Sequence, residues 1–201
     1  DEHEDDPGVG EDERGDVLLR RRLQGRDRRR DEEGRHVGRP QGDDGRTRDR
    51  LELILTAAEL AAVDVVVADA TDLEAIEAAA RRSGVTAIVH LAALQLPLCA
   101  ADPVTGARVN VQGTATAFEL ARRLEIGRVV YASSAAVYGP RDRYASAVVG
   151  PDAELFPTSH YGVFKVANEG TARVYHAIDG ISSIGLRPHS AYGPGRDQGI
   201  T

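Results

Sequence analysis

From residue 51 onward, short runs of aliphatic residues alternate with longer stretches in which apolar residues recur every three or four positions. Val- and Ile-rich runs of this kind are typical of buried strands, and the longer period is that of a helix with one apolar face. The pattern predicts strands at 63–70, 86–93, 128–134 and 182–188, and helices at 51–62, 71–84, 103–124 and 159–177.

Strands that alternate with helices predict an α/β fold. Two neighbouring parallel strands need a helix-length crossover between them, so we expect the four strands to form a doubly wound parallel sheet with helices on both faces. Ligands of such sheets bind beyond the carboxyl ends of the strands. Functional residues are therefore expected where the strands end.

Local signals mark both ends of the helix expected at 71–84. Thr71 and Glu74 have the spacing of a capping box, in which each side chain bonds the backbone of the other residue. Gly84 stands where a left-handed residue ends many helices. We therefore expect Thr71 to cap this helix.

The first fifty residues have a different composition. They hold half of the acidic residues of the chain but only six Val or Leu, too few to offset the chain entropy lost on folding. The Arg-rich stretch 20–30 could be a nucleic-acid-binding arm, but the interspersed Asp and Glu favour a solvated tail or a stretch translated in a shifted reading frame. We expect residues 1–50 to form an atypical charged, disordered segment.

Composition agrees with one soluble domain in residues 51–201. The chain has 201 residues, 41% of them hydrophobic, and a net charge of −7, and it contains no apolar run of membrane-spanning length. We therefore expect a cytoplasmic protein that binds neither nucleic acid nor membrane. Cys99 is the only cysteine, and no Cys/His cluster has metal-ligand spacing, so neither a disulfide nor a metal site is expected.

The strongest chemical signal is Tyr161 followed four residues later by Lys165. Residues at this spacing share one face of a helix. A free phenol is a poor base at neutral pH, because its pKa is near 10. A neighbouring ammonium stabilises the phenolate, so Lys165, assisted by an oxidised nicotinamide, is expected to make Tyr161 a general base.

Two further observations raise this pair above a chance spacing. Ser134 ends the strand expected at 128–134, where its hydroxyl could hydrogen-bond a reacting oxygen. Lys165 is the only lysine in a chain whose other basic residues are all Arg, and an ammonium is not interchangeable with a guanidinium at a site. We therefore predict that Ser134, Tyr161 and Lys165 are the catalytic residues.

Residues 51 to 201 resemble the extended short-chain dehydrogenase/reductase family, which includes NAD-dependent epimerases and dehydratases. The resemblance implies a partial Rossmann-like dinucleotide-binding domain. It is carried by motifs that occur in the family's order: Asp69-Ala70-Thr71-Asp72, His90-Leu91-Ala92-Ala93, Asn110-Val111-Gln112-Gly113-Thr114, Ser133-Ser134-Ala135-Ala136-Val137-Tyr138-Gly139, the Tyr161/Lys165 pair, and the stretch from Leu186 to Arg196.

This resemblance implies a set of binding residues. The implied cofactor is NAD or NADP, with a slight preference for NAD. Asp69 and Ala70 would lie at its adenine, Leu91, Ala92 and Ala93 along its ribose and phosphates, and Pro188 and His189 beside its nicotinamide. Asn110 would hold the central helix in register with the strands, and Ala132, Tyr161 and Lys165 would complete the cofactor site. Ser134, Ser190 and Arg196 would face the substrate.

The sequence departs from the family's pattern at its beginning and end. The glycine-rich turn that binds the cofactor pyrophosphate is not recognisable, since Gly8-Val9-Gly10 follows no apolar strand and lies among carboxylates. The chain stops at Thr201, where the family continues with a substrate domain of on the order of 100 residues. We therefore expect a fragment with an aberrant amino terminus, truncated before most of that domain.

The resemblance implies an NAD(P)-dependent epimerase or dehydrogenase that acts on a hydroxyl of a nucleotide sugar or a related polyol. Ala135 and Ala136 occupy the positions where the family's sugar dehydratases carry an Asp-Glu pair, which disfavours dehydration. The alternatives are a non-catalytic dinucleotide-binding or sensing protein, and an inactive fragment. A homodimer is also an open alternative.

Overall fold

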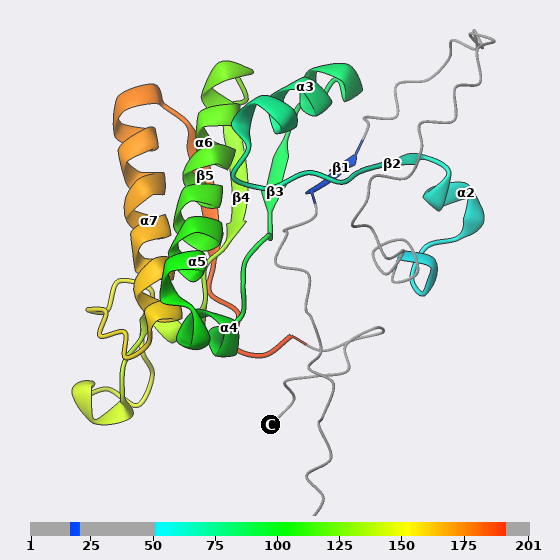
Figure 1. The fold of residues 1–201 in the computed structure, drawn as a ribbon. Helices are drawn as coiled ribbons and strands as arrows, with labels where there is room; N and C mark the ends of the chain where they lie inside the picture. The colour runs from blue at the N-terminus through cyan, green and yellow to red at the C-terminus, as the bar shows by residue number, and fades with distance from the viewer. Residues whose placement is uncertain (1–16, 21–50, 192–201) are drawn as a thin grey trace, which may run out of the picture.

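The structure is a computed structural model that describes residues 17–20 and 51–191, with side chains described for 51–191 (Figure 1). Its strands are β1 (Val17–Arg20), β2 (Val63–Val66), β3 (Ile88–His90), β4 (Arg128–Ala132) and β5 (Ser182–Leu186). Its α-helices are α2 (Ala57–Leu60), α3 (Leu73–Ser83), α4 (Leu96–Ala101), α5 (Pro103–Ala107), α6 (Gly113–Arg123) and α7 (His160–Asp179).

Three of the strands form a parallel sheet in the order β3-β4-β5. Its register places Val89 opposite Val130 and Val130 opposite Ile184. Helices connect each strand to the next, as the alternating pattern requires. The predicted α/β fold with a parallel sheet is confirmed.

The strand at 63–66 does not join this sheet, so the expectation of four strands in one sheet is wrong for the described residues. β2 pairs antiparallel with β1, and Val63 lies opposite Arg20. An aliphatic run specifies a strand but not its neighbour, because the choice of partner depends on residues distant in sequence. The described part of residues 1–50 is thus a strand rather than a disordered segment, and the rest of that range lies outside the described residues.

The N-cap of helix α3 lies one residue later than expected. Asp72 is the N-cap, and its carboxylate accepts a hydrogen bond from the Ala75 amide at 3.0 Å. The predicted Thr71–Glu74 capping box is therefore wrong, and the described capping box lies at Thr56 and Glu59, where α2 begins. Gly84 ends α3 in the left-handed conformation as predicted.

The helix expected at 103–124 is helical over most of its length but changes type in the middle. α5 leads into a π-helical turn at Arg108–Gln112, which leads into α6. Such turns occur frequently at functional sites, because they re-aim the side chains that they carry. The turn places Asn110 in the interior of the protein.

The main core lies where α6 and α7 pack on the middle strand of the parallel sheet. Phe118 of α6 is fully buried, stacks on Tyr175 of α7 at 5.4 Å between ring centroids, and meets Tyr131 of β4 edge-on at 5.7 Å. Val129 of β4 is also fully buried in this cluster. The core therefore fixes α7 against β4, the two elements that carry the predicted catalytic residues.

The described helices cover one face of the sheet rather than both. α6 and α7 stand on the same side of the strands (Figure 1). The strands advance in one direction across the sheet, and right-handed crossovers that advance in one direction place their helices on one face. On the other face Val89 and Ile184 are 62% and 50% exposed.

Candidate active site

Ser134 lies directly after β4, at the carboxyl end of the middle strand. It is the N-cap of a single 3₁₀ turn at Ala135–Val137, and its hydroxyl accepts a hydrogen bond from the Ala136 amide at 3.1 Å. The Ala135 amide in turn donates to the Pro188 carbonyl at 2.9 Å. The serine is therefore held between the ends of two parallel strands.

Tyr161 lies in the first turn of α7, close to this serine. Ser159 caps the helix by accepting from the Gly162 amide at 3.1 Å. A Cβ atom at Gly162 would collide with the Ala136 carbonyl oxygen, so the glycine allows the start of α7 to approach the serine turn. The phenol of Tyr161 lies close enough to the hydroxyl of Ser134 for the serine to lower its pKa.

Lys165 is almost fully buried, with 3% of its surface exposed. Its ammonium donates to the Ala132 carbonyl at 2.8 Å and lies 5.4 Å from the centroid of the Tyr161 ring. Burial lowers the pKa of Lys165 to about 8. The structure thus brings the three predicted catalytic residues together at one end of the sheet.

The acidity of Tyr161 differs from the expectation. Burial raises the pKa of the phenol, and the nearby Ser134 hydroxyl lowers it by less. The Lys165 ammonium lies over the face of the ring, where it attracts the π-electrons, and its charge is not among the causes that shift the pKa of the phenol. In this structure Tyr161 is therefore protonated at neutral pH, and the predicted lowering of its pKa by Lys165 is not seen.

Asn110 connects the π-helical turn to the segment after β3. It is fully buried, and its side chain bonds both backbone groups of Leu94, accepting from the amide at 2.7 Å and donating to the carbonyl at 3.0 Å. Its amide group also donates to the Cys99 sulfur at 3.3 Å. These contacts join the π-helical turn to the segment after β3, as a residue that keeps helix and strands in register would do. Contact of Asn110 with the cofactor stays a prediction.

The expected cofactor-binding residues after β3 and β5 also lie at the carboxyl ends of the sheet. Leu91 is exposed, and Ala92 and Ala93 are partly buried. Pro188 and His189 follow β5, and the ring of His189 lies 3.2 Å from the Ser190 hydroxyl. Arg196 lies outside the described residues, as do Gly8, Gly10 and Gly15.

Asp69 and Ala70 follow β2 and lie beside the helices of the central segment. The Asp69 carboxylate accepts from the amide and hydroxyl of Thr71 at 2.8 and 2.7 Å and pairs with Arg108 at 3.0 Å. Ala70 is buried against Gly113, where α6 begins. Their expected contact with the adenine stays a prediction.

His90 shows how strongly this end of the sheet excludes water. Burial, together with a smaller contribution from the charge of Lys165, lowers its pKa to about 4. The neutral ring lies 3.2 Å from the Thr114 hydroxyl. His90 is therefore a half-buried, neutral residue whose ring lies within hydrogen-bonding distance of Thr114.

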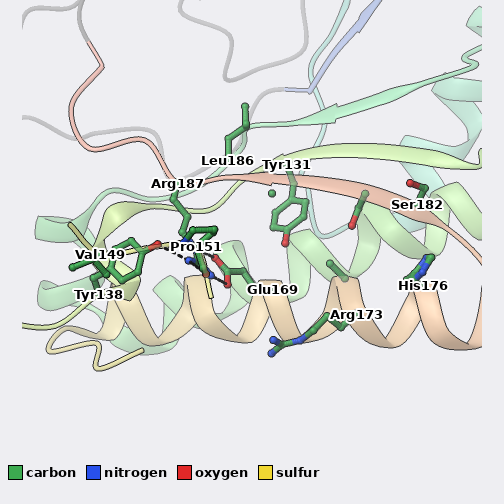
Figure 2. A pocket seen from close by; sticks show the side chains of 13 residues that line it. Tyr131, Tyr138, Val149, Pro151, Glu169, Arg173, His176, Ser182, Leu186 and Arg187 are labelled. Atoms are coloured by element: carbon green, nitrogen blue, oxygen red, sulfur yellow. Dashed lines mark hydrogen bonds and ion pairs between the residues drawn. The ribbon is translucent and has the colours of Figure 1, made fainter. Parts of the chain in front are cut away.

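An ion pair beside the predicted triad was not found from the sequence. Glu169 of α7 and Arg187, directly after β5, are joined by two hydrogen bonds of 2.8 and 2.7 Å (Figure 2). Glu169 also accepts from the Ser133 hydroxyl at 2.6 Å. The available signal was the position of Glu169 four residues after Lys165, on the same helical face.

This ion pair lines an open pocket of about 930 Å³ between α7 and β5 (Figure 2). Tyr131 and Arg173 also line it, but Ser134, Tyr161 and Lys165 do not. The pocket is therefore adjacent to the triad and separate from it.

Comparison with known proteins supports the same family as the motifs. A sequence model described as the NAD dependent epimerase/dehydratase family matches residues 24–200. The chain belongs to this family. Its helices and parallel sheet are accordingly those of a Rossmann-like epimerase/dehydratase domain, and the resemblance drawn from the motifs is confirmed.

Three relatives of this epimerase/dehydratase-family chain are informative. It is 33% identical over 143 residues to L-arabinose 1-dehydrogenase (NAD(P)(+)) of Haloferax volcanii, covering 66% of this chain and 55% of the relative. It is 34% identical over 112 residues to UDP-glucose 4-epimerase of Mycolicibacterium smegmatis, covering 55% and 35%. The structure of UDP-glucose 4-epimerase of Thermus thermophilus in complex with NAD matches with a TM-score of 0.56 and 29% identity, covering 60% of this chain and 39% of that one.

The chain spans about a third to a half of the length of the curated relatives that it matches. No helix within residues 51–191 is both long and apolar enough to cross a membrane. Across the same residues, no three His, Cys, Asp or Glu side chains are grouped so that they could hold a metal ion.

The family description indicates a nicotinamide dinucleotide, and the residues at the strand ends fit one. An ammonium has three donors, and within the described residues that of Lys165 makes one hydrogen bond, to the Ala132 carbonyl. Its remaining donors suit the hydroxyls of a ribose. The side chains of Ala92 and Ala93 are small and would allow a ligand to approach the backbone beyond β3.

Proposed function

We propose that this site carries out hydride transfer between a nicotinamide dinucleotide and a hydroxyl-bearing carbon of a nucleotide sugar or related polyol, as an epimerase or a dehydrogenase. The observation that carries the proposal is the proximity of the Ser134 hydroxyl to the Tyr161 phenol, with the buried ammonium of Lys165 over the phenol ring. All three lie at the carboxyl end of a parallel sheet, where ligands of such folds bind.

Tyr161 is proposed to move the proton at the reacting oxygen. In the reduction direction its protonated phenol donates a proton to the carbonyl oxygen as the carbon receives hydride. In the oxidation direction the phenolate accepts the proton of the substrate hydroxyl. Because burial raises the pKa of Tyr161, the oxidation rate should increase as the pH rises.

Ser134 and Lys165 are proposed to bind and orient. The Ser134 hydroxyl would hold the reacting oxygen against the phenol, since it lies close to Tyr161. Lys165 would bind the cofactor ribose through the donors not used by Ala132, and its charge would favour the phenolate once a ligand excludes water from the site. The bound nicotinamide supplies a hydride acceptor or donor.

Further residues are proposed to hold the cofactor and substrate. Leu91, Ala92 and Ala93 would line the cofactor after β3, and Pro188 and His189 would flank the nicotinamide after β5. Ser190 would contact the substrate. The relatives support an alcohol or sugar substrate, because their names specify an arabinose dehydrogenase and UDP-glucose epimerases.

The proposal is tested first by calorimetric titration of the full 201-residue chain with NAD and with NADP, and then by turnover across a panel of nucleotide sugars and free sugars. Tyr161→Phe should lower kcat by about 10²- to 10⁴-fold, because the proton donor is lost. Tyr175→Phe is the matched control, since Tyr175 is on the same helix and bonds Glu119 on α6.

Saturable dinucleotide binding with turnover that requires Tyr161 would support the enzyme. Binding without turnover would favour the non-catalytic, sensing alternative. If turnover were unchanged by Tyr161→Phe, the catalytic assignment would be wrong.

A further inference from the structure

Helix α7 contacts the end of β4 at three successive residues. Lys165 donates to the Ala132 carbonyl, Glu169 accepts from the Ser133 hydroxyl, and the Tyr161 phenol lies next to the Ser134 hydroxyl, which lowers its pKa. The three helix residues are spaced four apart and therefore share one face. The predicted catalytic pair thus makes two of three adjacent contacts, and Glu169 makes the third.

Glu169 binds the residue after β5 as well as the residue after β4. Its two carboxylate oxygens accept from Nε and Nη2 of Arg187 at 2.8 and 2.7 Å, in the two-pronged geometry that fixes both position and orientation. Arg187 directly precedes Pro188, whose carbonyl accepts from the Ala135 amide next to Ser134. A single carboxylate therefore ties α7 to the carboxyl ends of both β4 and β5.

The other end of Arg187 binds the segment that follows Ser134. Its Nη1 atom donates to the Tyr138 hydroxyl at 2.6 Å and to the Pro151 carbonyl at 2.7 Å (Figure 2). Burial raises the pKa of Glu169, but the bonds from Arg187 and Ser133 lower it by more, so the carboxylate is charged at neutral pH. The ion pair is thus intact under ordinary conditions.

We propose that Glu169 is a positioning residue, which sets the separation of α7 from the strand ends so that Tyr161 remains against Ser134 and the Lys165 ammonium remains buried on the Ala132 carbonyl. The inference rests on the proposed function for its catalytic meaning. The position of the Lys165 ammonium on the Ala132 carbonyl can be tested without reference to catalysis. An ordinary structural ion pair would add stability without controlling the environment of Lys165.

A second carboxylate offers a matched control. Glu119 of α6 also bonds two arginines and a tyrosine, Arg122, Arg123 and Tyr175. These partners lie on helices, and none is at a strand end. Glu119→Gln therefore removes a comparable ionic cluster without touching the contacts between α7 and β4.

Lys165 can report the effect directly because it is the only lysine. A protein labelled with ¹³C at lysine Cε gives one side-chain resonance, whose titration measures the pKa of Lys165. The titratable groups that act on Lys165 or contact it are His90, Cys99 and Tyr161, and none is altered by Glu169→Gln. The readout needs neither cofactor nor turnover.

The direction of the shift separates the two explanations. If Glu169 positions α7, Glu169→Gln lets water reach the ammonium and raises the pKa of Lys165 from about 8 towards 10.5, by about one unit. If Glu169→Gln removes only a negative charge, the positive charge of Arg187 is left uncompensated, and this lowers the pKa of Lys165. A rise in Glu169→Gln with no change in Glu119→Gln supports the proposal, and a fall or no change overturns it.

If Glu169→Gln does not fold, Ser133→Ala provides a second test. This variant removes one hydrogen bond to Glu169 and leaves the Glu169–Arg187 ion pair in place. It should raise the pKa of Lys165 by a smaller amount, and an unchanged value in folded protein overturns the proposal. Where turnover is measurable, Glu169→Gln should lower kcat at least about 10-fold with little change in KM. Tyr161→Phe tests the proposed function separately, since it leaves Glu169 intact.

Discussion

Two regions of this protein have strands of similar aliphatic content but very different packing. Around β4 and β5, helices α6 and α7 bury Phe118 and Val129 completely. The β1–β2 ribbon is only two-stranded, and the adjacent helix α2 has no buried residue, while Leu53 before it is 60% exposed. A two-stranded ribbon by itself is marginal in water. Burial, and with it the capacity to shift pKa values, therefore comes from helices that cover a strand and not from the strand's own hydrophobicity.

The largest expected effect tests this contrast in stability. Phe118→Ala should lower the free energy of unfolding by about 3–5 kcal/mol, because it leaves a cavity between Tyr131 and Tyr175. Val65→Ala in the partly buried β2 should cost less than about 1 kcal/mol. Urea denaturation followed by circular dichroism measures both. Equal losses would show that the β1–β2 ribbon is as well packed as the region around β4.

The next effect concerns the charge buried in the packed region. The pKa of Lys165 is about 8 in the folded chain and about 10.5 when exposed, so the unfolded chain binds more protons between these values. Stability should therefore rise with pH from 8 to 10, and the full contribution is up to about 3 kcal/mol. Tyr131, with its pKa raised to about 12, and Tyr161 add stability that is lost only above pH 10.

Lys165→Met is the control for this rise, since it keeps the apolar stem and removes the titrating group. Its unfolding free energy, measured by urea denaturation at each pH, should not rise from pH 8 to 10, and it should fall slightly above pH 9 because burial raises the pKa of the Cys99 thiol. A rise in the variant equal to that of the parent chain would assign the effect to another residue.

The smallest expected effect lies inside the packed region, where two buried asparagines have different surroundings. Asn110 makes three hydrogen bonds, whereas both polar side-chain atoms of Asn168 have no partner within the described residues. Asn168→Leu should raise the free energy of unfolding by about 1–2 kcal/mol, because it removes unpaired buried groups. Asn110→Leu should lower it, since it leaves the Leu94 backbone unpaired. A loss of stability in both variants would show that Asn168 has a partner that matters.

The three catalytic residues were predicted from signals between residues that are close in sequence. Ser159 caps α7 and Gly180 ends it, and the helix that results places Tyr161 and Lys165 on one face, as their spacing predicts. The end of β4 at Ala132 likewise brings Ser134 to the edge of the sheet. These features could be predicted because helix caps and side-chain periodicity are set by neighbours in sequence.

Glu169 could not be identified in this way. Its partners are Ser133, 36 residues earlier in the chain, and Arg187, 18 residues later. Nothing in the local pattern distinguishes it from Glu119, which occurs on another amphipathic helix and binds arginines at three and four residues' distance. The difference between a surface cluster and a link between strand ends exists only after the chain has folded.

By itself the sequence determined the alternation of strands and helices, the family, and the face of α7 that carries Tyr161 and Lys165. Only the tertiary structure decided that β2 pairs with β1, that one face of the sheet is bare of described helices, and that the pKa of Tyr161 is raised. The physical reason is that strand pairing and desolvation depend on groups that are distant along the chain, whereas helix capping and periodicity depend on the next few residues.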